Sequence, residues 1–414
     1  MVKISIIMPI YNGAEFLKRS IESVSKQTLE EIELICVDDG SEDNSLELLE
    51  EYAEKYSFIR ILTQENQGSG KARNYGMDEA KGDYIAFLDA DDIFVEEDAL
   101  ERMYDLGIAH DAGMVCANLK ELLPNGDLAY NSNYKDGNYF EFKSYERIQP
   151  ERYGVPWAFY KNIYQKKMLD DNEIRFRDLI RGQDPVFMAE VLANVGDIYG
   201  LPIVLYAYLF PVEGKPFIKV NSPLKKLHYI THYKMTFDTF ENAELYSLSE
   251  KYKPKFLNYL RHSLRIKDLE TYDIVIDLFG KENHYFDNFK QDFEVFKIGH
   301  LLNKINVERT EEFFQEAKKE LSGYEVWNND LITVDLFRQI TFINSCETYE
   351  EYREGFYKVN IINLKEEQEK LIKKNKSLAK KNKKLKKTLK EKKELHDSLL
   401  NSSSWKLTKS MRKE

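Results

Sequence analysis

The first 105 residues alternate between short apolar runs and amphipathic stretches of helical length. Strands separated by helices of about 10–15 residues are typical of α/β proteins with a doubly wound, mostly parallel sheet. Ligands of such sheets bind at the carboxyl ends of the strands. The expected strands are residues 3–10, 32–37, 58–62 and 84–88, and the expected helices are residues 14–26, 45–56 and 70–81.

Polar clusters follow three of the expected strands. They are residues 11–13 after the first strand, residues 38–41 after the second and residues 89–92 after the fourth. Because the carboxyl ends of parallel strands meet at one edge of a sheet, these clusters predict a binding site at that edge.

Carboxylates dominate the cluster after the fourth strand, where Asp89, Asp91 and Asp92 follow an apolar run. Negative charge at the end of a buried strand is costly unless a cation neutralises it. Mg²⁺ binds through one or two carboxylates together with substrate phosphates. The segment therefore suggests a metal ion that holds a diphosphate, although acidic turns after strands are also common.

Two further acidic residues, Asp38 and Asp39, end the second strand. Ser41 and Asp43 behind them are suited to cap the next helix. Capping does not explain the second carboxylate at the strand end, which can accept a hydrogen bond from the N–H of a uracil ring.

Residues 67–74 are rich in glycine but do not match a phosphate-binding P-loop. Glu65 occupies the position of its first Gly, and Ala72 that of the Ser or Thr after Lys. Lys71 and Arg73 fall in the first turn of the expected helix, where cations oppose the helix dipole. An anion bound at that helix end would explain them.

Four segments of the first 92 residues resemble, in order, the nucleotide-sugar half of family 2 glycosyltransferases of the GT-A fold. These segments are Ser5–Asn12, Val37–Ser41, Gly68–Gly76 and Phe87–Asp92. The resemblance implies a nucleotide-sugar donor, with UDP expected, and Mn²⁺ or Mg²⁺ as cofactor. The implied donor-binding residues are Pro9, Tyr11, Asn12, Asp39, Arg73, Asp89 and Ala90, with Asp91 as the direct metal ligand.

The second half carries a further match to that family, in which a Gly-Glu-Asp element before a helix supplies the catalytic base. Here the element reads Gly182-Gln183-Asp184. The resemblance implies Asp184 as the base, and an Asp followed by Pro185 is also a favourable helix start. Gln183 departs from the usual Glu and removes a neighbouring charge.

Contacts with the acceptor are implied at Trp157 and Gln183. A large aromatic residue is also a common core residue, so Trp157 has two open interpretations. His228 and His232 are candidates for a further metal ligand by residue type only, and surface or core positions are more usual for histidine.

Together these residues predict an inverting hexosyl- or N-acetylhexosaminyltransferase that acts on a surface-glycan or lipid-linked acceptor. The alternative is an inactive, transferase-like scaffold that oligomerises through its C-terminal helix. Gln183 favours the scaffold, and the complete set of carboxylates opposes it. The Gln-x-x-Arg-Trp element of processive synthases is absent, so a membrane-spanning polymerase is not expected.

The expected division of the chain follows changes in pattern. Additional strand patterns occur at residues 114–118 and 138–142, and a helix pattern occurs at residues 185–193. The expected parts are a GT-A domain at 1–215 (nucleotide-sugar half 1–105, acceptor half 106–215), a helical domain at 216–360, a Lys-rich coiled-coil or single helix at 361–400 and a basic amphipathic tail at 401–414.

The C-terminal segment differs from the rest in charge. Residues 361–414 carry 18 Lys+Arg against 7 Asp+Glu, so the net charge of −11 divides into +11 there and −22 elsewhere. Leucines recur every seven residues, which favours a coiled coil and a homo-oligomer, whereas polar residues at the alternate seam positions equally allow a single solvated helix. The leucines are Leu364, Leu371, Leu378 and Leu385. Residues 401–412 also resemble the tails of many prokaryotic surface-polysaccharide transferases, and their basic residues around Trp405 suit an anionic membrane surface.

The expected location is the cytoplasm, with peripheral attachment to the inner membrane face. We expect no signal peptide, and no apolar stretch reaches the roughly 18 residues of a membrane-spanning helix. Three widely spaced cysteines, Cys36, Cys116 and Cys346, fit a reducing compartment. No nucleic acid is expected among the partners.

Overall fold

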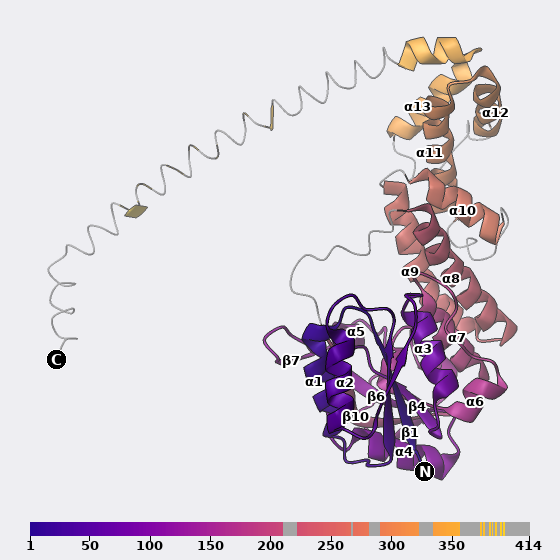
Figure 1. The fold of residues 1–414 in the computed structure, drawn as a ribbon. Helices are drawn as coiled ribbons and strands as arrows, with labels where there is room; N and C mark the ends of the chain where they lie inside the picture. Colours follow the sequence, from indigo (N-terminus) through magenta and orange to yellow (C-terminus); the bar gives the residue numbers. More distant parts are fainter. Residues whose placement is uncertain are drawn as a thin grey trace. The chain divides into compact units, whose positions relative to one another are not determined.

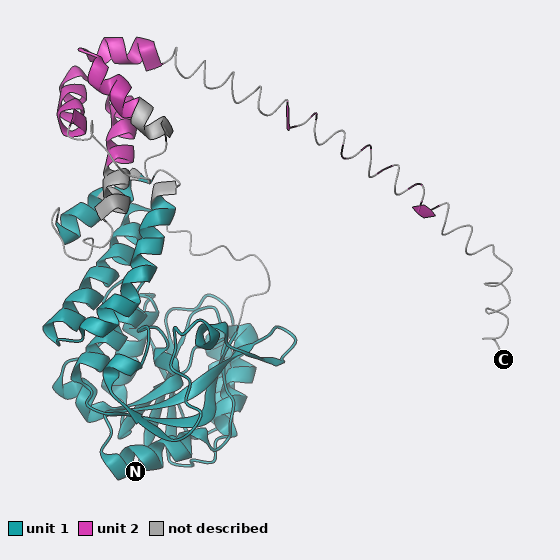
Figure 2. Cartoon of the chain, turned by 180° about the vertical axis from the view of Figure 1, so that it is seen from behind, with its two compact units in different colours: residues 1–296 teal, residues 297–414 magenta. Residues whose placement is uncertain are grey.

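The computed structural model describes residues 1–209, 222–265, 268–280, 290–322 and 334–356, and scattered residues between 373 and 393. The chain divides into two compact units, Met1–Phe296 and Lys297–Glu414 (Figure 2). The expected boundary at 215/216, the four seam leucines and the tail at 401–414 lie outside the described residues.

Four parallel strands in the order β3-β2-β1-β4 form the first part of the sheet (Figure 1). All residues of β1 and β2 are buried, as expected for strands covered on both faces. The strands are β1 (Ile4–Ile10), β2 (Ile32–Asp38), β3 (Ile59–Thr63) and β4 (Tyr84–Phe87), and the intervening helices are α1 (Ala14–Ser25), α2 (Ser45–Lys55) and α3 (Ser69–Glu79). The predicted alternation of strand and helix is confirmed.

The sheet continues beyond β4 in the order β9-β6-β10-β5. Strand β9 is antiparallel to β4 and β6, whereas β10 is parallel to β6, so the sheet is mixed. The elements of this part are β5 (Ile93–Phe94), α4 (Ala99–His110), β6 (Met114–Leu122), β7 (Leu128–Tyr130), α5 (Ser132–Lys135), β8 (Glu146–Ile148), η1 (Pro150–Arg152), η2 (Phe159–Lys161), β9 (Asn162–Gln165), α6 (Lys166–Asp171), α7 (Gln183–Asn194) and β10 (Ile198–Leu209).

The strand predicted at residues 138–142 does not form. Only Tyr139 makes a β-bridge there, with Gly154. The side chain of Asn118 accepts from the Phe142 N–H at 3.0 Å and donates to its carbonyl at 2.9 Å. A side-chain amide thus replaces the neighbouring strand as hydrogen-bond partner, an arrangement that apolar periodicity does not reveal.

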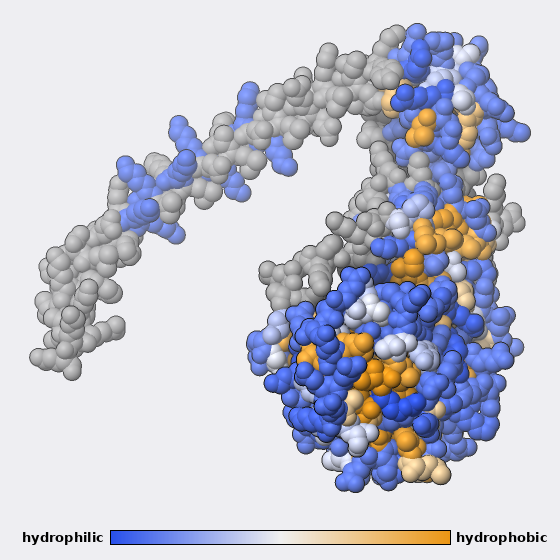
Figure 3. Space-filling model, viewed as in Figure 1, coloured by the Kyte–Doolittle hydropathy of each residue, from blue (hydrophilic) through white to orange (hydrophobic). Residues whose placement is uncertain are grey.

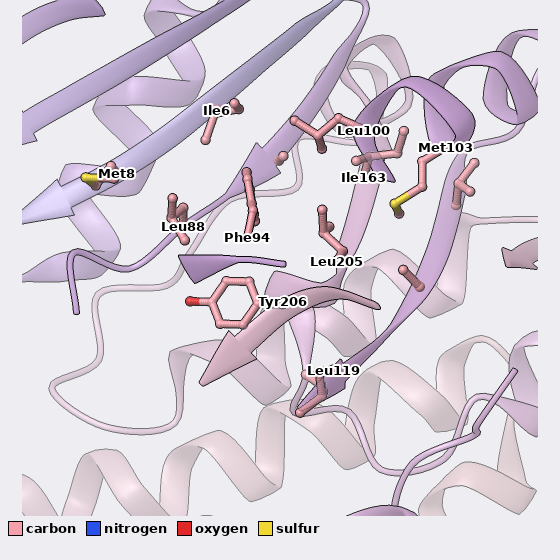
Figure 4. Close-up of a cluster of buried hydrophobic side chains, with 14 of the residues drawn as sticks. Ile6, Met8, Leu88, Phe94, Leu100, Met103, Leu119, Ile163, Leu205 and Tyr206 are labelled. Atoms are coloured by element: carbon pink, nitrogen blue, oxygen red, sulfur yellow. The ribbon is translucent and has the colours of Figure 1, made fainter. Parts of the chain in front are cut away.

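Each face of the sheet has its own apolar core. Along β1, Ile6 and Met8 belong to one core and Ile7 to the other, as the two-residue period of a strand requires. Figure 4 shows the first core, where Leu100 and Met103 of α4 approach side chains of the sheet. Tyr206 lies among its residues (Figure 4).

Helices follow the sheet, as predicted from about residue 222 onward. In the first unit α8 (Pro223–Asn242) packs on α7, and α9 (Tyr246–Arg265) and α10 (Leu269–Phe279) pack on α8. The second unit has its own core around Phe314 and Ile340. Further along the described part of the chain are the helices α11 (Lys290–Glu308), α12 (Glu311–Leu321) and α13 (Val334–Ser345).

Hydrophilic residues cover most of the surface visible in Figure 3, and hydrophobic residues gather in a patch on the sheet-containing unit. Among the described residues no helix is both long and apolar enough to cross a bilayer.

Gly82, two residues before β4, permits a close approach of two backbone segments. A Cβ atom on Gly82 would lie 2.5 Å from the backbone N of Ser5 and 2.9 Å from the backbone C of Ile4. We expect Gly82→Ala to lower the free energy of unfolding by about 1–3 kcal/mol, because β1 must shift to accept the methyl group. Urea unfolding followed by far-UV circular dichroism measures the change.

Gly196→Ala is the matched control, since a Cβ atom there meets nothing within 4 Å. Its effect should stay within about 0.5 kcal/mol. Equal stability of the two variants would contradict the close approach described for Gly82.

Candidate functional site

The polar clusters after β1, β2 and β4 lie at the carboxyl edge of the sheet, and their hydrogen bonds assign them different tasks. Asn12 has a left-handed backbone (φ 51°), and its side-chain oxygen accepts from the N–H groups of Glu42 and Asp43 at 2.8 and 3.3 Å. Asn12 therefore holds the loop between β2 and α2. Pro9 is buried in β1, whereas Tyr11 at the edge is half exposed.

Asp39 holds the loop that leads into α3. Its carboxylate accepts from the side chain of Gln64 at 2.7 Å and from the N–H groups of Gln67 and Gly68, both at 2.8 Å. Asp38 is also buried, and one of its oxygens accepts from the Ser41 N–H at 3.3 Å. A carboxylate has about four acceptor positions, so Asp39 keeps capacity for one further donor.

The turn after β4 directs its carboxylates to different environments. Asp92 is fully buried and accepts from the Tyr206 hydroxyl at 2.5 Å and the Leu209 N–H at 2.6 Å. Burial, together with the nearby Asp89 and Asp91, raises the pKa of Asp92. Asp92 thus ties the turn to β10, a role that the sequence pattern did not reveal.

Side chains of α1 fix the backbone of the same turn. The Ser20 hydroxyl donates to the carbonyls of Ala90 and Asp92 at 2.5 and 2.7 Å, and Arg19 donates to the carbonyl of Asp91 at 2.6 Å. The backbone that carries the Asp91 side chain is therefore held in place by α1. Ser20 and Arg19 show no motif that would have marked them in the sequence.

Arg73 of α3 is the central cation of the site. Its guanidinium is buried, donates to Asp89 at 2.6 Å and lies 4.8 and 5.2 Å from the ring centroids of Phe159 and Phe176. Burial lowers the pKa of Arg73, but the carboxylates of Asp89 and Asp184 outweigh this effect and raise it. The guanidinium therefore experiences the charge of both the turn after β4 and the start of α7.

The anion expected near the first turn of α3 is supplied by carboxylates of the chain itself. Arg73 pairs with Asp89, and Lys71 pairs with Asp178 at 2.9 Å. Carboxylates of the chain thus neutralise both cations.

Asp184 lies in the first turn of α7, so the helix start expected at Asp184 and Pro185, with Asp184 as its cap, was wrong. The helix begins at Gln183, and Gly182 with φ 86° is the cap residue. Burial raises the pKa of Asp184 to about 6, against the opposing effect of Arg73 and with a smaller contribution from Asp89. A carboxyl group with this pKa can accept a proton near neutral pH.

Gln183 packs against the start of α3. A Cβ atom on Gly70 would lie 2.0 Å from the Gln183 Oε1, so the Gln183 side chain occupies the space beside this glycine. The Oε1 atom is buried and has no hydrogen-bond partner within the described residues. Gln183 therefore joins the glycine-rich entry of α3 to the start of α7.

Trp157 has a packed environment. Its indole N–H donates to the Tyr252 hydroxyl at 3.2 Å, and the Lys255 ammonium lies 4.8 Å from the centroid of its ring. The Tyr252 hydroxyl also lies 3.0 Å from the Nε2 of His232. Trp157 thus belongs to a polar chain that connects it with helices α9 and α8.

The two histidines of α8 support the loop before α7. The His228 Nδ1 accepts from the Ile180 N–H at 2.9 Å. His232 is buried, and its ring lies so close to Gly182 that a Cβ atom there would approach within 2.2 Å. Burial lowers the pKa of His232 to about 3, so its ring is neutral at physiological pH.

No group of three or more His, Cys, Asp or Glu side chains within the described parts of the chain forms a ready metal cage. Asp89 and Asp91 remain as two carboxylates at the carboxyl end of β4, both partly exposed. This donor set fits a hard divalent ion whose remaining ligands are phosphate oxygens and water.

Comparisons with known proteins agree with this arrangement. Residues 5–166 match the family model described as glycosyl transferase family 2. The cholesterol galactosyltransferase of Borreliella burgdorferi is 31% identical over 209 residues, which are 47% of this chain and 57% of that protein. The poly(ribitol-phosphate) beta-glucosyltransferase of Bacillus spizizenii is 29% identical over 223 residues, 52% of this chain and 33% of that protein. The chain thus spans less than two thirds of the length of either relative.

A solved structure supports the fold. TarS 1–349 of S. aureus, in complex with UDP-GlcNAc, matches with a TM-score of 0.51 over 87% of this chain and 92% of that chain. The sequence identity is 20%, so this likeness concerns the fold alone.

The buried neutral histidine predicts a dependence of stability on pH. The pKa of His232 is lower in the folded protein (about 3) than its ordinary value of 6.5, so below pH 6.5 the unfolded chain binds a proton that the folded chain does not. Its contribution to stability is present above pH 6.5 and is lost as the pH falls toward 3, by about 1.4 kcal/mol per pH unit. Urea unfolding of wild type and His232→Gln at several pH values between 6.5 and 4 should show this excess slope in the wild type.

Tyr252→Phe serves as the control, because it removes the hydroxyl near the His232 Nε2 and keeps the titrating ring. It should lower stability and retain the wild-type slope. Identical slopes for wild type and His232→Gln would show that His232 is not buried in its neutral form.

Proposed function

We propose that the chain transfers a sugar from a nucleotide diphosphate, with UDP as the nucleotide, to a hydroxyl group of a glycan or lipid-linked acceptor. The match of residues 5–166 to the glycosyl transferase family 2 model and the likeness of the fold to that of TarS support this proposal. The sugar is a hexose or N-acetylhexosamine, and its anomeric configuration is inverted. The position of Arg73 is the observation that carries this proposal. Arg73 pairs with Asp89 after β4, and the charge of Asp184 at the start of α7 helps to raise the pKa of Arg73.

The donor belongs at the carboxyl edge of the sheet. Tyr11 offers a half-exposed ring there, and Asp39 has an acceptor position left for a base N–H. The TarS structure of similar fold holds UDP-GlcNAc, which makes UDP-sugars the first donors to test.

Asp91, with Asp89 beside it, would hold Mn²⁺ or Mg²⁺ against the diphosphate. A bound divalent ion supplies neutralisation of the charge that develops on the leaving diphosphate. The chain prepares for this by fixing the Asp91 backbone through Arg19 and by directing Asp92 away from the edge.

Asp184 is the proposed general base. It removes the proton from the acceptor hydroxyl while that oxygen attacks the anomeric carbon from the face opposite the diphosphate. The raised pKa of Asp184, about 6, makes the carboxylate more basic, and because it lies below 7 most of the group is still deprotonated at neutral pH. One displacement then inverts the configuration.

Calorimetry tests the donor site. We expect the wild type to bind UDP more tightly with Mn²⁺ than without it, and more tightly than GDP or CDP under the same conditions. Asp91→Ala should abolish the effect of Mn²⁺, because it removes the proposed metal ligand. Asp127→Ala, in an exposed loop, is the matched control and should bind as the wild type does.

Failure of the wild type to bind any of the three nucleotides would overturn the proposal and favour the inactive scaffold.

Transfer assays test the base. Asp184→Asn should lower the rate of transfer by about 10²–10⁴-fold, because it removes the group that accepts the proton. The affinity for UDP should stay at the wild-type value, since the substitution preserves the size and shape of the side chain. Asp171→Asn, an exposed position that pairs with Lys167, is the control and should leave transfer unchanged. Near-normal turnover by Asp184→Asn would show that another group accepts the proton.

A further inference from the structure

Three tyrosines of the second half of the sheet pack as a group beside the carboxylates. Tyr160 lies against Tyr206, with ring centroids 4.5 Å apart and an angle of 29° between the rings. It also lies against Tyr208, at 6.0 Å and 16°. We call Tyr160, Tyr206 and Tyr208 the tyrosine stack.

The inner end of the tyrosine stack is fixed to the turn after β4. The Tyr206 hydroxyl donates to Asp92 at 2.5 Å and accepts from the Asp89 N–H at 3.2 Å. The Leu209 N–H donates to the same Asp92 carboxylate at 2.6 Å. Tyr206 and Leu209 lie on either side of Tyr208 in β10, and both donate to Asp92. The backbone that carries Tyr208 is therefore held next to the turn.

The outer member of the stack is open to solvent. Tyr206 is fully buried, but Tyr208 is 38% exposed although it packs against Tyr160. Burial, followed by the charges of Asp92, Asp91, Asp89 and Asp184, raises the pKa of Tyr208 to about 12. Tyr208 is thus a partly exposed residue that directly precedes Leu209, whose N–H is bonded to Asp92.

Trp157, the aromatic residue that the family resemblance implied for the acceptor, is less suited to receive a sugar. Its ring has the Lys255 ammonium 4.8 Å from its centroid, and Tyr252 meets it edge to face. Its indole N–H is already bonded to the Tyr252 hydroxyl. Tyr208, by contrast, combines a solvent-exposed ring with a fixed backbone near the carboxylates.

We propose that Tyr208 is the platform on which the acceptor sugar stacks, with the tyrosine stack behind it as a rigid support. A pyranose ring has an apolar face of C–H groups and polar hydroxyls at its rim, which matches an aromatic ring bordered by carboxylates. The platform would hold a sugar ring so that one hydroxyl reaches Asp184. This inference rests on the proposed function and adds the class of acceptor, a pyranose-containing glycan.

Binding of the full-length protein to an array of bacterial oligosaccharides and simple pyranosides, in the presence of UDP and Mn²⁺, tests the proposal. The wild type should bind pyranose-containing glycans, and Tyr208→Ala should bind the same glycans about tenfold more weakly. Tyr208→Phe keeps the ring and should stay within about twofold of the wild type. Tyr145→Ala removes another exposed tyrosine, located before β8, and should have no effect.

Calorimetric titration of each variant with UDP separates the acceptor from the donor. Equal UDP affinity for wild type and Tyr208→Ala, together with weaker glycan binding, supports the proposal. Unchanged glycan binding by Tyr208→Ala overturns it, as does a parallel loss of UDP affinity, which would place the ring against the donor. A wild type that binds UDP but no glycan also overturns it and leaves the proposed function standing, whereas absence of UDP binding removes both.

Discussion

The ion pair between the buried Arg73 and the partly exposed Asp89 is the interaction on which the site depends. The guanidinium lies near the rings of Phe159 and Phe176 and donates to Asp89 at 2.6 Å. A buried charge is tolerated when it is paired, and removal of one partner leaves the other uncompensated at a cost of about 3–5 kcal/mol. Phe159 and Phe176 come from the second half of the sheet domain, so this one cation joins the donor half to the part that carries Asp184.

Environment, rather than residue type, separates the roles of the aspartates at the carboxyl edge. Asp39 holds the loop into α3 and keeps one acceptor position, and Asp92 is turned inward onto Tyr206 and β10. Asp89 and Asp91 stay partly exposed at the edge. Asp184, partly buried at the start of α7, has a pKa raised to about 6. The same chemical group can therefore serve as a structural anchor, as a candidate metal ligand and as a candidate base.

Local patterns in the sequence were sufficient to predict the parallel half of the sheet. Strand and helix periods are properties of neighbouring residues, so the boundaries of β1, β2, α1 and α2 were predicted to within one residue or so. The polar motifs also correctly predicted which loops lie at the carboxyl edge of the sheet. Their side chains are divided between binding the chain itself, as for Asn12 and Asp39, and facing the open edge.

Long-range contacts account for what the sequence did not reveal. The amide of Asn118 takes the place of a strand beside Phe142, 24 residues away in the chain. The left-handed Gly182, with His232 packed against it, shifts the start of α7 ahead of Asp184. His228 and His232 have no local signal that distinguishes a metal ligand from a support for a loop, and the exposure of Tyr208 depends on packing against Tyr160 from another segment.

Measurement of the pKa of Asp184 would decide whether this carboxylate can act as the base. Selective ¹³C labelling of aspartate carboxyl groups, with the Asp184→Asn spectrum as the assignment, would follow this one residue as the pH is changed. The account predicts a pKa of about 6, because burial outweighs the attraction of Arg73. A value near the ordinary 3.8 would show a well solvated carboxylate and would contradict its role as the base.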